Sequence, residues 1–188
     1  SVTLDQVKDQ GMIKKSVILN PDFSNEYTAK RIESALSQTS DQFVLNEAIA
    51  KRNALAEGYK RQGSSVNPLM LIQLPDKKSE IEEQLMSDVI SYLQNDHGIT
   101  VDNGKLAVYL SESKENLENI AKQDSEVEVM IFKQAIALGW DCPRAQILVL
   151  FRDHKSLAFS IQTVGRIMRM PEPDLGHYSD ELLNNSFV

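Results

Sequence analysis

The sequence predicts an α/β fold in which helices cover a mainly parallel sheet. Two observations support this prediction. Apolar runs of four to six residues are nearly continuous, as in strands buried on both faces, and helical patterns separate them. Such alternation of strands and helices is typical of layered α/β domains. The four expected strands are 69–72, 106–110, 127–132 and 147–151.

Helical periodicity is clearest after the first of these strands. Residues 79–94 place apolar side chains four positions apart, from Ile81 to Leu93, which predicts one buried helix face. Ser79 and Glu82 have the spacing of a capping box at its start. The further helices expected between or after strands are 114–122 and 156–169, and 186–188 could begin another strand.

The first third of the chain has a different pattern. Residues 26–37 and 41–62 both predict helices, so we expect 1–65 to form a linking segment and a helical arm, and 66–188 to form the sheet domain. The segment from Gly58 to Ser65 has the glycine spacing of a phosphate loop but lacks its lysine. It also lies at the end of an expected helix, whereas a phosphate loop precedes one. We therefore interpret it as a helix stop.

Composition excludes several classes of protein. The 188 residues suit one domain, and a net charge of −7 excludes a broadly basic nucleic-acid coat. The single cysteine, Cys142, excludes an intramolecular disulfide and favours a cytoplasmic location. The apolar runs are too short for a membrane span, and the three histidines have no metal-ligand spacing. The first residue is not Met, which suggests a piece of a longer chain.

Charge is unevenly distributed along the chain. Residues 64–128 carry 5 basic and 13 acidic side chains, whereas 129–170 carry 6 basic and 2 acidic ones. The acidic part is typical of solvated helix faces. The basic stretch 129–170 contains the arginines of the expected helix 156–169.

In the expected helix 156–169, Gln162, Arg166 and Arg169 have the spacing i, i+4, i+7, which places them on one stripe. Neighbouring arginines repel each other unless they meet an anion, and guanidinium groups suit phosphate. Gly165 beside them would allow close approach of another group. A solvated face with surface arginines is the alternative. The opposite, apolar stripe consists of Leu157, Ile161, Val164 and Met168.

These residues resemble a known family. The text Gly139-Trp-Asp-Cys-Pro143, followed by Gln162-Thr-Val-Gly-Arg-Ile-Met-Arg169, is similar to motifs V and VI of superfamily 2 helicases and translocases. Residues 68–75 resemble the motif IV region. The wider text resembles the restriction subunit of type III restriction-modification enzymes, and 4–21 resembles the segment after the first motor domain of that subunit.

The resemblance implies that 66–188 is a second RecA-like motor domain, which closes over ATP held by the first. Arg169 would be the arginine finger and Arg166 a second γ-phosphate contact. Lys133 stands where the family often has Thr, which puts that phosphate contact in doubt. The further ATP-binding residues implied are Gln162, Gly165, Gly139 and Asp141, with Asp141 contacting the ribose or the motif VI arginines. The implied nucleic-acid contacts are Lys133, Gln134 and Gln73.

The resemblance also implies partners. The first RecA-like domain would carry the phosphate loop and the acidic motif that holds Mg²⁺, and this sequence contains neither. We therefore expect no ATP hydrolysis by these residues alone. Double-stranded DNA and a methyltransferase subunit are the other implied partners. Two alternatives remain: a RecA-like nucleic-acid or partner-binding module without ATPase activity, and a generic doubly wound nucleotide-binding domain.

Overall fold

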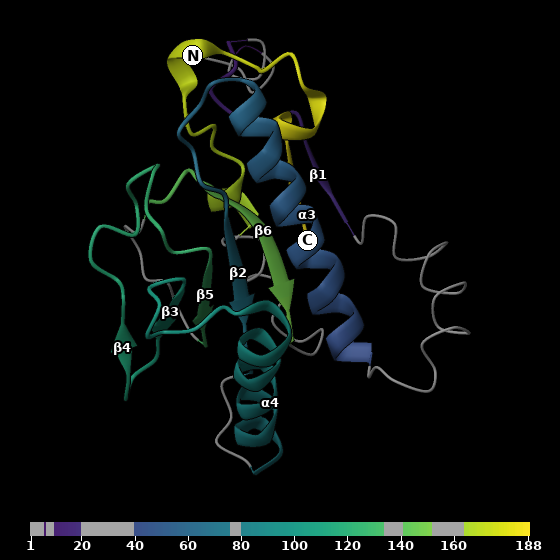
Figure 1. Ribbon diagram of the computed structural model, residues 1–188. Helices are drawn as coiled ribbons and strands as arrows, with labels where there is room; N and C mark the ends of the chain where they lie inside the picture. The colour runs from purple at the N-terminus through teal and green to yellow at the C-terminus, as the bar shows by residue number, and fades with distance from the viewer. Residues whose placement is uncertain (1–5, 7–9, 20–39, 76–79, 134–140, 152–163) are drawn as a thin grey trace.

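The computed structural model describes residues 6, 10–19, 40–75, 80–133, 141–151 and 164–188. Within them the chain is an α/β protein with a seven-stranded sheet in the order β1-β7-β6-β2-β5-β3-β4 (Figure 1). All neighbouring strands are parallel except β4, which runs antiparallel to β3. The strands are β1 (Ser16–Ile18), β2 (Leu69–Gln73), β3 (Leu106–Tyr109), β4 (Lys114–Glu115), β5 (Val129–Phe132), β6 (Ala145–Leu150) and β7 (Asn185–Phe187).

The four strands predicted from apolar runs are confirmed as β2, β3, β5 and β6, and the strand start predicted at 186–188 is β7. The helices whose bounds are both described are α3 (Ser40–Arg61), α4 (Glu80–His97) and the 3₁₀ turns η2 (Pro173–Leu175) and η3 (Glu181–Asn184). The helix predicted at 79–94 is therefore confirmed as α4. No helix among the described residues combines the length and apolar character needed to cross a membrane.

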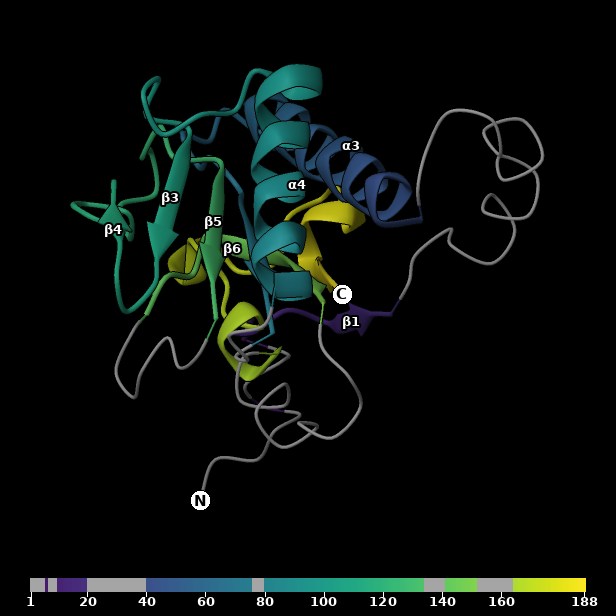
Figure 2. The same ribbon diagram turned by 90° about the horizontal axis from the view of Figure 1, so that it is seen from below.

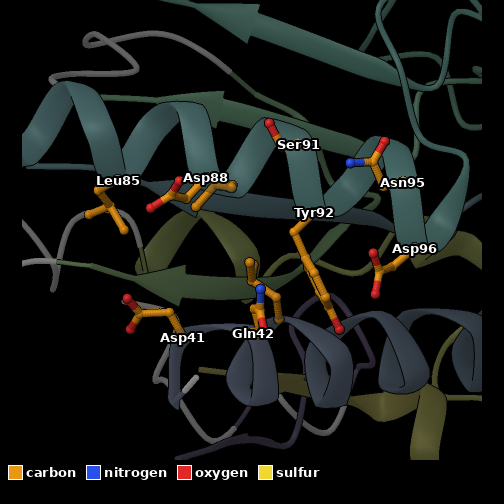
Figure 3. Close-up of a pocket in the computed structure, with 10 residues that line it drawn as sticks. Asp41, Gln42, Leu85, Asp88, Ser91, Tyr92, Asn95 and Asp96 are labelled. Atoms are coloured by element: carbon orange, nitrogen blue, oxygen red, sulfur yellow. The ribbon is translucent and has the colours of Figure 1, made fainter. Parts of the chain in front are cut away.

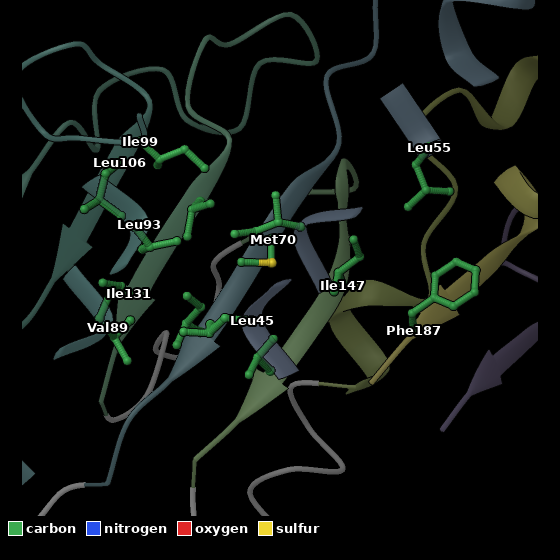
Figure 4. Packing of buried hydrophobic residues seen from close by; sticks show 14 of the residues in the cluster. Leu45, Leu55, Met70, Val89, Leu93, Ile99, Leu106, Ile131, Ile147 and Phe187 are labelled. Atoms are coloured by element: carbon green, nitrogen blue, oxygen red, sulfur yellow. The ribbon is translucent and has the colours of Figure 1, made fainter. Parts of the chain in front are cut away.

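Both faces of the sheet are covered, which explains why its strands lack in/out alternation. Helices α3 and α4 lie on the same face (Figures 1 and 2). There Leu45 and Val89 pack with Met70, one of the β2 residues that face the helices (Figure 4). The alternate β2 residues Leu69 and Leu71 pack on the opposite face, in a cluster that includes Ile120, Val127, Met130 and Ile167.

Helix α3 differs from the predicted arm, because it packs directly on the sheet. Leu45, Ile49 and Tyr59 are almost fully buried in the helix-side core. The helix ends where the glycine pattern predicted a stop: Gly63 has a φ of 71°, and the Ser64 N–H donates to the Tyr59 carbonyl at 3.0 Å. The helix predicted at 26–37 lies outside the described residues.

The prediction of a helix at 114–122 is wrong. Its first residues form β4, and turns follow. Asn116 and Asn119 have φ values of 55° and 58°, which interrupt a right-handed helix. The Asn116 side-chain amide also donates to the carbonyls of Val101 at 2.8 Å and Leu106 at 2.9 Å. Asparagine tolerates this left-handed conformation better than most residues, so the apolar spacing was misleading here.

Candidate functional site

The predicted site residues that the structure describes lie at opposite edges of the sheet. Gln73 ends β2 and Lys133 follows β5, so both lie at the carboxyl edge of the parallel strands. Asp141 precedes β6 and contacts Arg169, which in turn pairs with a residue just before β1. These two therefore lie at the amino edge. The parallel topology thus separates the expected nucleic-acid contacts from the expected ATP contacts.

Asp141 and Arg169 form an ion pair although 28 positions separate them in the sequence. The Arg169 Nη1 atom lies 2.5 Å from the Asp141 Oδ2 atom, and the side chains are 59% and 53% exposed. An exposed pair contributes only about 0–1 kcal/mol to stability. The fold therefore does not depend on this pair, and Arg169 is accessible to an anion from outside.

The helix predicted to run to 169 ends earlier. Among the described residues 164–167 are helical, and Arg169 instead forms an antiparallel bridge with Ile13. The Lys14 N–H donates to the Met168 carbonyl at 2.7 Å, and the Met170 N–H donates to the Met12 carbonyl at 3.1 Å. This pairing replaces helical hydrogen bonds, so the prediction that Arg166 and Arg169 share one helical stripe is wrong.

The buried side chains at this helix end also differ from the prediction. Ile167 is 0% exposed and Met170 is 2% exposed, whereas the predicted core residue Met168 is only half-buried. Val164 is partly buried against the sheet, as predicted. The remaining predicted residues of this region, Leu157, Ile161 and Gln162, lie outside the described residues, as do Gly139 and Gln134.

Lys14 is a residue that sequence reasoning missed. Its side chain is 0% exposed. The ammonium donates to the carbonyls of Ile167 at 2.5 Å and Arg169 at 2.6 Å. These carbonyls lie at the end of the helix, where helices leave unsatisfied acceptors. No local pattern distinguishes Lys14 from Lys15, which is exposed and pairs with Glu181 at 2.7 Å.

Stability should depend on pH through Lys14. Burial lowers its pKa from 10.5 to about 7, opposed by the nearby Cys142 sulfur. Between these values the unfolded chain binds a proton that the folded chain does not, so the free energy of unfolding rises with pH. We expect a gain of about 2 kcal/mol from about pH 7 to 9, absent in Lys14→Met. Urea unfolding of both proteins at several pH values checks this. An equal change in the free energy of unfolding with pH in both proteins would contradict it.

Gly165 is exposed, and among the described residues outside its own helical turn, no atom lies within 4 Å of where a β-carbon would stand. Contacts described within the chain therefore do not require glycine at this helical position. Gly165→Ala should raise the free energy of unfolding by about 0.5–1 kcal/mol, because alanine restricts the unfolded chain and favours helix. Urea unfolding measures this gain; a loss of stability would show that the position is strained.

Arg144 belongs to the basic stretch 129–170 but is 0% exposed. Its guanidinium donates to the carbonyls of Ile120 at 2.7 Å, Asn67 at 2.9 Å and Val127 at 2.7 Å. Burial lowers its pKa to about 10. Arg144 therefore holds loops together at the amino edge and is not accessible to a phosphate, so the charge count overstated the accessible basic surface.

Gln73 is also fully buried, so its side chain does not face solvent at the carboxyl edge. Its Nε2 atom donates to the Lys133 carbonyl at 3.4 Å, and its Oε1 atom has no hydrogen-bond partner among the residues that the structure describes. Lys133 itself is half-buried. Gln73 thus supports the backbone at Lys133, while the role of Lys133 as a phosphate contact stays a prediction.

A groove of about 380 Å³ lies between α3 and α4 (Figure 3). Its described lining carries the carboxylates of Asp41, Asp88 and Asp96 together with Tyr92 and Asn95, and no basic side chain. Such a groove repels a triphosphate. The accessible Arg169 at the amino edge is therefore the better candidate for phosphate contact.

Comparison with known proteins adds no relative to this geometry: no family model, curated protein or solved structure matches the chain. Among the described residues, no three His, Cys, Asp or Glu side chains gather as potential metal ligands.

Proposed function

We propose that this chain is the second RecA-like motor domain of an ATP-dependent DNA translocase of the superfamily 2 kind, most similar to the type III restriction subunit. One observation carries the proposal. Arg169 is exposed, while the backbone on which it stands is held by the bridge to Ile13 and by the Lys14 ammonium. The layered sheet with mainly parallel strands is compatible with a RecA-like domain.

Such an arrangement suits an arginine finger. Charge develops on the phosphoryl oxygens in the transition state of transfer, and a pre-positioned guanidinium stabilises that charge. Asp141 holds Arg169 at the surface before an anion arrives, and the planar guanidinium has further N–H donors for phosphate. Arg166, half-buried one residue before Ile167, is the proposed second contact.

ATP and Mg²⁺ would be held mainly by the first motor domain, because this sequence has no phosphate loop. Of the predicted ATP contacts, the structure describes Asp141, Gly165 and the two arginines. We expect the 188-residue chain alone to show no ATP turnover above background in a phosphate-release assay, with or without DNA. Turnover like that of a complete motor, about 1 s⁻¹ or more, would contradict the half-site proposal.

Lys133 is the proposed DNA-backbone contact at the carboxyl edge. Lys133→Ala should weaken DNA binding by the full two-domain protein similarly for all sequences, and lower the slope of log K against log salt by about 1. Fluorescence anisotropy at several salt concentrations measures this slope. Lys122→Ala removes an exposed lysine elsewhere and is the control. An unchanged slope in Lys133→Ala would remove Lys133 from the interface.

The absence of a phosphate loop also favours a second candidate, a RecA-like module that binds nucleic acid or a partner without any ATPase half. The two candidates differ in what they require of Arg169. A motor half needs it for catalysis, whereas a binding module does not. ATP hydrolysis by the longer protein with Arg169 replaced therefore distinguishes them, as argued in the Discussion.

A further inference from the structure

The segment 10–15 is locked against the C-terminal part of the chain. Gly11 has a φ of 69°, and a β-carbon there would lie 2.4 Å from the Gly176 Cα atom. The Lys15 N–H donates to the Asn184 carbonyl at 2.8 Å. His177 Nε2 and the Ile13 carbonyl lie 2.9 Å apart. These contacts fix the segment on both sides of Lys14.

Lys14 connects this segment to the backbone of Arg169 through hydrogen bonds. Its ammonium reaches two carbonyls, those of Ile167 and Arg169, which flank the point where the chain leaves the helix. The Ser186 hydroxyl also donates to the Ile167 carbonyl at 2.5 Å. Ser186 thus supports the Ile167 carbonyl, whereas Lys14 donates to the Arg169 carbonyl as well. The Arg169 carbonyl and side chain belong to one residue, so fixing the first fixes the point from which the second extends.

We propose that Lys14 is a positioning residue for Arg169: its buried side-chain amino group holds the 167–169 backbone so that the Arg169 guanidinium stands beside Asp141. This inference rests on the proposed function for its catalytic consequence, but not for its structural one. Under that function, the segment that contains Lys14 leads from the first motor domain. Lys14 would then connect the entering chain to the finger of the second domain.

The structural consequence can be tested on the 188-residue chain. Lys14→Met keeps the length of the side chain but removes its donors. We expect the Met170 amide, which donates to the Met12 carbonyl, to exchange with solvent hydrogen about 10- to 100-fold faster. The matched control is Lys15→Met, which removes an exposed lysine and should leave this amide unchanged. Unchanged exchange in a folded Lys14→Met protein would overturn the proposal.

A measurement on the unaltered protein covers the case in which Lys14→Met does not fold. Reductive methylation should modify Lys14 at least about 100-fold more slowly than Lys15, because Lys14 reacts only after its segment opens. Mass spectrometry of peptides from a time course distinguishes the two lysines. Equal rates would show that the ammonium does not hold the 167–169 backbone.

The catalytic consequence requires the protein that contains both motor domains. Lys14→Met should lower kcat for ATP hydrolysis about 10- to 100-fold with a similar KM for ATP, and Lys14→Arg, which keeps donors, should recover part of the loss. In an Arg169→Ala background, Lys14→Met should have no further effect. If Arg169→Ala alone has no effect, the proposed function fails; if it lowers kcat but Lys14→Met does not, only the positioning role fails.

Discussion

Replacing Arg169 with alanine should lower kcat for ATP hydrolysis about 10³-fold or more in the protein that joins this chain to a phosphate-loop domain. Under the proposed function, the exposed guanidinium would supply charge to the transition state from across an ATP cleft. Its loss should hardly change folding, because the pair with Asp141 is exposed. Steady-state phosphate release at saturating ATP and DNA measures the effect.

Arg61→Ala is a matched control for this experiment. Arg61 is 65% exposed and forms a surface ion pair with Asp180 at 3.6 Å, so its replacement also removes one accessible guanidinium. It should leave kcat unchanged. A near-normal kcat in Arg169→Ala would remove the finger assignment and favour the binding module, whereas equal losses in both variants would indicate a general charge effect.

Replacing Arg144 with alanine should lower the free energy of unfolding by about 3–5 kcal/mol. The change removes the donors to the carbonyls of Ile120, Asn67 and Val127 and leaves a void in their place. A buried acceptor without a donor loses about 1–3 kcal/mol, and these losses occur together. Most domains have only 5–15 kcal/mol of stability, so the variant should be close to unfolding.

Urea unfolding followed by circular dichroism measures this loss. Arg61→Ala is again the matched control, since an exposed arginine in a surface pair should change stability by less than about 1 kcal/mol. Nearly normal stability of Arg144→Ala would show that the hydrogen bonds of this arginine do not hold the loops together. Its side chain would then again be a candidate for phosphate contact.

The sheet could be predicted because its signal is local. Strands buried on both faces need continuous apolar runs, and β2, with Met70 facing the helices and Leu71 facing the opposite side, shows why. The error at 114–122 is also local in origin. The spacing of Leu117 and Ile120 suggested a helix, but the left-handed conformation of Asn116 and Asn119 decides the backbone there.

The site could be predicted less completely, because distant residues build it. At the end of the helix at 167, the carbonyls accept from Lys14, which lies 155 positions before Arg169. Helical periodicity alone extended that helix to 169 and placed Arg166 and Arg169 on one stripe. Likewise, a charge count includes Arg144 among accessible basic residues, and only the fold shows that backbone carbonyls surround it.

The most direct test of the central claim is the affinity of the two-domain protein for a transition-state analogue, ADP with aluminium fluoride, compared with ADP alone. An arginine finger stabilises the transferring phosphoryl group, so it binds the analogue far more strongly than the product. Arg169→Ala should lower affinity for the analogue about 10²-fold or more and leave affinity for ADP unchanged. Unchanged affinity for both ligands, or an equal loss for both, would contradict the claim that this chain supplies the arginine finger.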